Sequence, residues 1–178
     1  MKNKDIPEIE KMPSFKEREF DVEELKNFLK GPAKQMWAIE APEITPQRPG
    51  YKELKHIDGD WCLRDSYTGY FQAPGMSTLY YKGELAWTIS YGGKMHEEHY
   101  EKTKPTFKFL KLALRQENRG EADDLPVRGP TLFEDGDWRY EFKYVGDLKC
   151  FSGKERIFFK GAEVFFQDVI GGLVIPKK

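Results

Sequence analysis

Asp58-Gly59-Asp60-Trp61 recurs along the chain as Asp135-Gly136-Asp137-Trp138, 77 positions later (58 to 135). Tyr81-Lys82-Gly83 is followed in the same way by Phe159-Lys160-Gly161, 78 positions later (81 to 159). Self-similarity at a nearly constant spacing is the mark of an internal repeat. The alternative is coincidence, because Asp-Gly and Lys-Gly are common turn sequences in any β-meander. Several turn residues recur at nearly the same spacing, which favours a duplication.

Each copy predicts a four-stranded antiparallel meander. Asp58-Gly59 and Lys82-Gly83 are signals for two-residue hairpins, because glycine readily adopts the positive φ that a type I′ turn requires. Apolar and polar residues alternate between the turns, which is typical of strands with one buried face. The expected strands are 51–57, 60–67, 76–82 and 84–91 in the first copy, and 130–134, 137–145, 153–159 and 162–170 in the second.

A helix is predicted before each meander. The first begins near Asp21, whose carboxylate can accept hydrogen bonds from the backbone of the first turn, and ends at Gly31-Pro32. The second is expected near residues 104–118, where apolar residues share one helical face.

The predicted fold class is therefore α+β, with internally duplicated units of one helix and a four-strand antiparallel meander, and with the helices on one face of the sheet. We expect residues 1–20 to form a charged N-terminal arm. Residues 21–178 would be a single domain made of two repeats, about 21–95 and 103–175. The pattern leaves open whether the repeats form one sheet of about eight strands or two packed sheets.

The composition is that of a globular chain with balanced charge. Of 178 residues, 29 are basic and 30 are acidic, which gives a net charge of -1, and 15% are aromatic. The aromatic share predicts a packed core rather than disorder. The balanced charge excludes a nucleic-acid binder that acts through bulk positive charge.

The N-terminal sequence has no apolar core of the kind that a signal peptide needs, and no segment approaches about 18 consecutive apolar residues. Cys62 and Cys150 have no redox or metal-motif spacing, which favours reduced thiols. We therefore expect a cytoplasmic protein with no membrane association, and the balanced charge predicts no direct binding of nucleic acid. A small-molecule ligand and a homodimer both stay open.

Comparison of the two copies predicts a binding site in the first. Asp65 occupies the strand position that Phe142 has in the second copy, and His56 occupies the position of Phe133. A carboxylate on an apolar face is costly unless it is paired, so its presence suggests a function. The candidate ligand-binding residues are Asp65, Tyr67, Arg64, His56, Tyr80, Trp87 and Tyr91.

A purely structural explanation of Asp65 competes with this hypothesis. A turn at Asp58-Gly59 would place Lys52 opposite Asp65. It would also place Glu53 opposite Arg64, so that both pairs are complementary in charge. Asp65 would then be half of an ion pair near the end of the sheet. The aromatic candidates have a similar alternative, since most buried rings are ordinary core.

No motif in the sequence predicts a cofactor, a metal centre or a set of catalytic residues. His96 and His99 are three positions apart (96 to 99), whereas the zincin motif requires four. Asp58-Gly59-Asp60 lacks the remaining ligands of a calcium loop. The sequence contains no GxxxxGK[ST], no GxGxxG after a strand and no GxSxG.

Two segments, Leu63-Arg64-Asp65-Ser66-Tyr67-Thr68-Gly69 and Tyr80-Tyr81-Lys82-Gly83-Glu84-Leu85-Ala86-Trp87, resemble a bacterial and archaeal family known as domain of unknown function 5680. In the second half, Phe151-Ser152-Gly153-Lys154-Glu155 and Gly171-Gly172-Leu173-Val174 are also similar to it. The resemblance spans about residues 35–175. The family is uncharacterised and some members are fused to helix-turn-helix regulators, so the resemblance implies no activity and no catalytic residue.

Three functions fit these observations. The main hypothesis is a non-catalytic domain that binds a small molecule or a partner, with a sensing role, in which Asp65 and Arg64 are the polar anchors of the aromatic region. The first alternative is an enzyme that uses Asp65 as general acid or base, assisted by His56 or Tyr67. The second alternative is a protein–protein interaction module that uses an exposed sheet face or edge.

Overall fold

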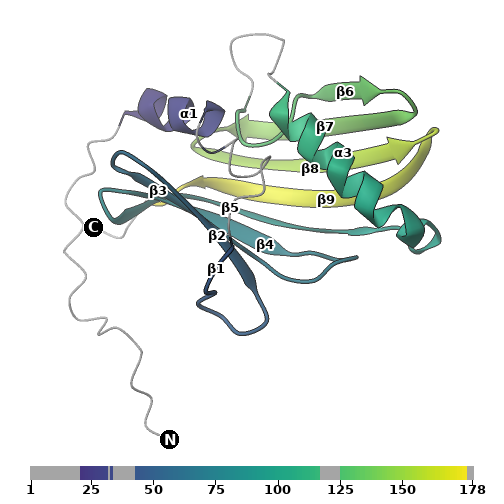
Figure 1. Cartoon of the computed structure of the whole chain (residues 1–178). Helices are drawn as coiled ribbons and strands as arrows, with labels where there is room; N and C mark the ends of the chain where they lie inside the picture. The colour runs from purple at the N-terminus through teal and green to yellow at the C-terminus, as the bar shows by residue number, and fades with distance from the viewer. Residues whose placement is uncertain (1–20, 32, 34–42, 117–124, 176–178) are drawn as a thin grey trace, which may run out of the picture.

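The computed structural model of the protein (Figure 1) describes residues 21–31, 33, 43–116 and 125–175. In these residues nine strands form one antiparallel sheet, in the order β1-β2-β3-β4-β5-β9-β8-β7-β6. The strands are β1 (Glu43–Ile44), β2 (Lys52–Asp58), β3 (Trp61–Tyr67), β4 (Gly75–Tyr81), β5 (Glu84–Met95), β6 (Leu132–Asp135), β7 (Trp138–Asp147), β8 (Cys150–Phe159) and β9 (Ala162–Leu173). The helical segments are α1 (Val22–Lys30), the 3-10 helix η2 (Glu97–Lys102) and α3 (Thr103–Arg115).

The predicted α+β class, built from repeated units of one helix and four strands, is wrong. The fold is β-rich, because both meanders belong to one sheet and the described helices are short. The meanders meet where β5 pairs with β9, from Trp87 opposite Leu173 to Met95 opposite Phe165. Local patterns locate strands but do not say which distant strands will pair, so this seam had no signal in the sequence.

The elements themselves lie close to their predicted positions. All eight expected strands are present as β2–β9, whereas β1 is too short to produce an alternating pattern. Helix α1 begins after Asp21, whose carboxylate accepts a hydrogen bond from the backbone N–H of Glu23 at 2.9 Å. The predicted arm at 1–20 lies outside the described residues, and the division into two repeats stays a prediction. No helix in the described ranges is long and apolar enough to cross a membrane.

The two Lys-Gly hairpin turns have the backbone geometry that the turn signals predict. Lys82 and Gly83 both have positive φ, 50° and 85°, as a type I′ turn requires. Lys160 and Gly161 repeat this geometry at 50° and 82°. A non-glycine residue adopts positive φ only at some cost, so the glycine at the second turn position keeps that cost to one residue in each hairpin.

The hairpin between β2 and β3 has a different register from the predicted one. Asp58 pairs with Trp61, so the two turn residues are 59 and 60. Asp65 consequently lies opposite Leu54, and Lys52 lies opposite Tyr67. The predicted pairing of Asp65 with Lys52 is therefore wrong, and the ion-pair explanation of Asp65 that depended on it fails.

One face of the sheet, here called the inner face, packs against both α-helices. Phe28 of α1 stacks on Trp61 of β3 with ring centroids 5.6 Å apart, and Phe109 of α3 stacks on Trp138 of β7 at 5.4 Å. Figure 1 shows α3 running across β7, β8 and β9. The buried side chains of the inner face and of both helices form one hydrophobic core.

Candidate functional site

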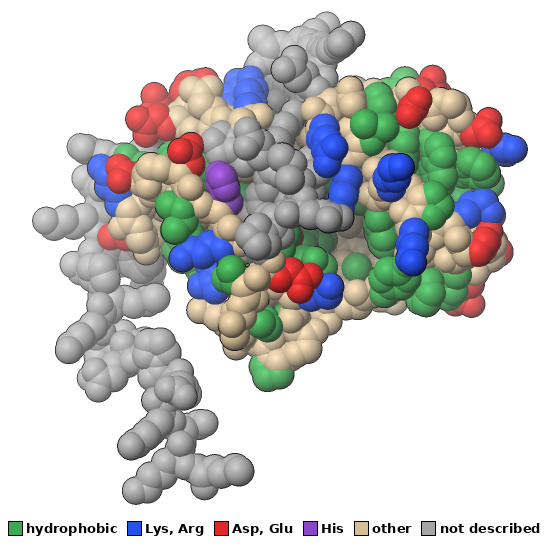
Figure 2. Space-filling model, viewed as in Figure 1, with side chains coloured by type: hydrophobic (Ala, Val, Ile, Leu, Met, Phe, Trp, Pro, Cys, Tyr) green, Lys and Arg blue, Asp and Glu red, His purple; other side chains and the backbone are tan. Residues whose placement is uncertain are grey.

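A cavity of about 550 Å³ lies between α3 and the inner face of the sheet. Helix α3 lines it with apolar side chains, Phe107, Leu110 and Leu114, while the sheet contributes polar ones that include Asp65 and Tyr91. In Figure 2, Lys and Arg side chains gather over α3, and the surface beside them is hollowed. An apolar wall facing a few polar groups is the usual construction of a small-molecule site.

Asp65 lies in the polar floor of this cavity. Alternation along β3 points Trp61, Leu63 and Asp65 to the inner face, and Asp65 is only 6% exposed. The hydroxyl of Ser77 donates to Oδ1 at 2.7 Å, and the hydroxyl of Tyr91 lies 3.0 Å from Oδ1 and 3.2 Å from Oδ2. These two hydroxyls hold the carboxyl group in place.

Gly75 allows Tyr91 to reach Asp65. Gly75 lies directly opposite Tyr91 across β4 and β5. A Cβ atom at position 75 would lie 2.4 Å from Cζ and from the hydroxyl oxygen of Tyr91, well inside van der Waals contact. A larger residue would displace the ring, so the missing side chain positions the hydroxyl that bonds Asp65.

Burial raises the pKa of the Asp65 carboxyl above its ordinary value. The hydrogen bonds from Ser77 and Tyr91 and the positive charge of Arg128 lower the pKa, but they do not cancel the loss of hydration. Burial and the nearby Asp65 charge also raise the pKa of Tyr91 well above its ordinary value. The phenol therefore stays protonated and donates to Asp65.

A second buried network lies beside Asp65. Arg128 forms two hydrogen bonds with Glu155, from Nε to Oε1 at 2.8 Å and from Nη2 to Oε2 at 2.7 Å. The Tyr140 hydroxyl donates to Oε1 at 2.5 Å, and the Gln167 side-chain amide donates to Oε2. Burial alone would lower the pKa of the Arg128 guanidinium, but Glu155 raises that pKa above its ordinary value, so Arg128 stays charged.

Arg128 and Gln167 reach the cavity, while Glu155 lies beneath them with no exposed surface. The bonds to Glu155 use Nε and Nη2 of Arg128, and no described residue bonds its Nη1. At the rim, Lys52 forms an ion pair with Glu43 at 2.9 Å. The charges cancel within the Arg128–Glu155 pair and within the Lys52–Glu43 pair. Asp65 is therefore a buried carboxyl with no ion-pair partner among the described residues.

The structure brings together three of the seven sequence-predicted site residues. Asp65, Tyr67 and Tyr91 all line the cavity. Arg64 follows the alternation to the opposite, outer face, where it forms an ion pair with Glu53 at 2.5 Å. His56 packs against Phe28 of α1, away from the cavity.

The remaining two predicted residues lie apart from the cavity for different reasons. Trp87 is fully buried on the inner face, and its indole N–H donates to the backbone oxygen of Leu148 at 3.0 Å, so it belongs to the core. Tyr80 lies on the outer face. A register shift between Leu79 and Tyr80 pairs Leu79 with Trp87, so Tyr80 and Trp87 lie on opposite faces of the sheet and do not form one site.

Sequence reasoning missed Arg128, Glu155 and Gln167. Glu155 lies between the buried Phe151 and Ile157 on alternating positions of β8, so it has the same signal that identified Asp65. Gln167 has the same signal on β9. Arg128 comes from an irregular segment between α3 and β6, and no periodic pattern predicts the direction of its side chain.

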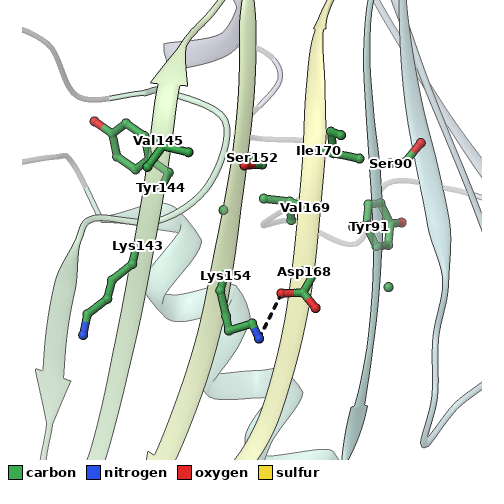
Figure 3. Close-up of a pocket in the computed structure, with 12 residues that line it drawn as sticks. Ser90, Tyr91, Lys143, Tyr144, Val145, Ser152, Lys154, Asp168, Val169 and Ile170 are labelled. Atoms are coloured by element: carbon green, nitrogen blue, oxygen red, sulfur yellow. Dashed lines mark ion pairs between the residues drawn. The ribbon is translucent and has the colours of Figure 1, made fainter.

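The outer face of the sheet carries a shallow depression (Figure 3). It spans β5, β7, β8 and β9, and its volume of about 670 Å³ exceeds that of the cavity. Its charged groups are solvated, as in the ion pair between Lys154 and Asp168 at 3.3 Å, and Val145 and Ile170 are 71% and 63% exposed. It offers no buried polar anchor, so the cavity beside α3 is the better candidate.

The raised pKa of Asp65 predicts a characteristic pH dependence of stability. The unfolded chain loses this proton near pH 4, whereas the folded protein keeps it to a higher pH. The contribution of Asp65 to stability is therefore present below about pH 4 and is lost as the pH rises through the folded pKa. As the pH rises above about 4, the free energy of unfolding of Asp65→Asn should therefore increase relative to that of the native protein. Urea denaturation at several pH values measures this difference.

Asp168→Asn on the outer face is the matched control, because Asp168 is well exposed. Its stability relative to the native protein should not rise with pH in this way. If the free energies of unfolding of the two variants depend on pH in the same way, burial does not govern the ionisation of Asp65.

The family model described as "Domain of unknown function (DUF5680)" matches residues 65–174. This range is shorter at its N-terminal end than the resemblance noted in the sequence, and it contains Asp65, Tyr91, Arg128 and Glu155. No curated protein and no solved structure matches the chain. Within the described residues, no group of three His, Cys, Asp or Glu side chains is placed to hold a metal ion.

Proposed function

Because the chain belongs to the DUF5680 family of domains of unknown function, whose description names no activity, we propose a function from the site itself. The protein binds a small organic molecule in the cavity between α3 and the inner face, and it releases that molecule unchanged, as a sensing domain would. The observation that supports this most directly is Asp65, a nearly buried carboxyl that faces a cavity rather than a charged partner.

The dimensions and the lining of the cavity support the same proposal. A volume of about 550 Å³ lies within the range of roughly 300–1,000 Å³ that small-molecule sites occupy. Phe107, Leu110 and Leu114 provide a wall for an apolar body. Asp65 and Arg128 on the opposite side provide an acceptor and a donor that fix its orientation.

Leu110→Trp should abolish binding, because the larger ring fills the space beside α3. Leu110 is only partly buried, so the helix can carry the substitution without a large cost to the core. We expect ligands that raise the melting temperature of the native protein in a metabolite screen to have no effect on this variant, since a ligand stabilises only a state that binds it.

Leu112→Trp is the matched control. Leu112 is partly buried on the same helix but does not line the cavity. Native mass spectrometry of all three proteins would show any retained ligand. If Leu110→Trp binds as the native protein does, or if Leu112→Trp loses binding equally, the cavity is not the binding site.

An enzyme that uses Asp65 as general acid is the second candidate function. It is favoured by one observation, the raised pKa of a carboxyl that faces a cavity. Tyr67 lies in the same cavity and could assist, whereas His56 does not. Incubation of an identified ligand with the protein, followed by mass spectrometry of the ligand, separates the two functions, since only an enzyme changes its mass or structure and loses that activity in Asp65→Asn.

A further inference from the structure

We propose that the cavity recognises an organic cation, a protonated amine with an apolar body, whose ammonium group donates hydrogen bonds to Asp65. This inference rests on the proposed binding function and adds the chemical class of the ligand.

The buried charge of Glu155 is balanced within the protein, whereas that of Asp65 is not paired with any described residue. Glu155 accepts two hydrogen bonds from Arg128, one from Tyr140 and one from Gln167, so both of its oxygens are saturated. An ionised carboxylate has about four acceptor positions, and all are used here. The charge of Arg128 is committed to Glu155, and no other cationic side chain of the described residues pairs with Asp65, so a cationic ligand can balance the charge of Asp65.

The Asp65 carboxyl group can accept more hydrogen bonds than the described residues donate to it. Its described donors are the hydroxyl of Ser77 and the hydroxyl of Tyr91, whose single proton is shared between two oxygens. About two of the four acceptor positions of the carboxylate are therefore unused. An ammonium group has three donors and no acceptor, so it complements this side of the cavity.

Aromatic rings surround the Asp65 carboxyl group in the cavity. Tyr67, Tyr91, Phe107 and Phe165 line the cavity around it. The faces of aromatic rings carry partial negative charge and attract cations, most strongly where water is excluded. Leu110 and Leu114 then face the apolar body of the ligand.

An anionic ligand fits the same cavity less well. It would bring a third negative charge beside Asp65 and Glu155, and the Arg128 guanidinium that lines the cavity is already paired with Glu155. Lys52 at the rim is already paired with Glu43, and Lys111 of α3 is engaged in another contact. A carboxylate ligand held by Nη1 of Arg128 is nevertheless a distinct outcome that the experiment below can detect.

The test compares ligands that share a body and differ in head group. Phenethylamine, phenethyl alcohol and hydrocinnamate form one series, and hexylamine, hexanol and heptanoate form another. At pH 7 the amines are protonated, and titration calorimetry with ligand-observed NMR measures each affinity. We expect each amine to bind at least about tenfold more tightly than its alcohol, because hydrogen bonds to charged groups are the stronger ones.

Asp65→Asn should reduce this preference to within about twofold, since the amide keeps the shape of the carboxyl and loses its charge. Asp168→Asn, on the outer face, should keep the full preference. An amine preference that survives in Asp65→Asn would overturn the proposal, because another group would then hold the cation.

Failures of the inference and of the proposed function are distinguishable. If an alcohol or a carboxylate binds the native protein as tightly as the amine, and Leu110→Trp abolishes that binding, the cavity is a binding site and the proposed ligand class is wrong. If no compound of either series binds at millimolar concentration, the proposed ligand class is wrong, and the metabolite screen with Leu110→Trp decides the binding function separately.

Discussion

Arg128→Met should lower the free energy of unfolding by about 3–5 kcal/mol, because it leaves Glu155 buried without its counter-charge. Glu155 has no exposed surface and Arg128 is 8% exposed, so solvent screens the unpaired charge only weakly. Tyr140 and Gln167 still donate to the carboxylate, but neither supplies a positive charge. Urea denaturation monitored by tryptophan fluorescence measures the change.

Two variants separate this effect from a general cost of substitution. Arg156→Met, on the same sheet, removes an ion pair with Glu163 whose partners are 44% and 27% exposed. Exposed pairs contribute about 1 kcal/mol or less, so this variant should be nearly as stable as the native protein. The double variant Arg128→Met with Glu155→Leu should recover much of the loss, because no unpaired charge remains. Equal stabilities of Arg128→Met and Arg156→Met would contradict the prediction.

Trp87→Ala should have a comparable effect, about 3–5 kcal/mol, because it empties a fully buried position. The indole stacks on Phe151 of β8 with ring centroids 6.0 Å apart, and it also satisfies the backbone oxygen of Leu148. Position 87 lies in β5 at the seam with β9, so the empty space left by the missing indole weakens the contact between the two meanders. Thermal and urea unfolding would both report the loss.

Ile170→Ala on the outer face is the control for Trp87→Ala. Its side chain is 63% exposed, and such surface positions change stability by about 0.5 kcal/mol or less. The milder variant Trp87→Phe tests the binding hypothesis as well. It should keep the affinity for the amines, since Trp87 does not line the cavity. A selective loss of amine binding in Trp87→Phe would return this residue to the candidate site.

The cavity depends on the seam between the meanders, because its polar groups come from both sides of it. Asp65 and Tyr91 belong to β3 and β5, whereas Gln167 belongs to β9 and Arg128 to the segment before β6. The carboxyl acceptor Asp65 therefore comes from the first meander, and the guanidinium donor Arg128 comes from the segment that leads into the second. Pairing of β5 with β9 therefore completes the sheet and assembles the candidate site at the same time.

The sequence by itself determined the local elements and the identity of one unusual residue. Alternation of apolar and polar residues located strands β2 to β9, and Lys-Gly turns have the positive φ that was expected at Lys82 and Lys160. Asp65 was identified because a carboxylate on an apolar strand face is costly wherever that strand packs. These are properties of short segments, so a short range of sequence is enough to predict them.

Tertiary structure alone decided the fold class, the register at Asp65 and the composition of the cavity. A shift of the turn by one residue placed Asp65 opposite Leu54 instead of Lys52, and a register shift at Leu79 separated Tyr80 from Trp87. Arg128 joined the site from an irregular segment. Each of these outcomes depends on which distant groups approach one another, and that choice is set by the packing of the whole chain rather than by any local pattern.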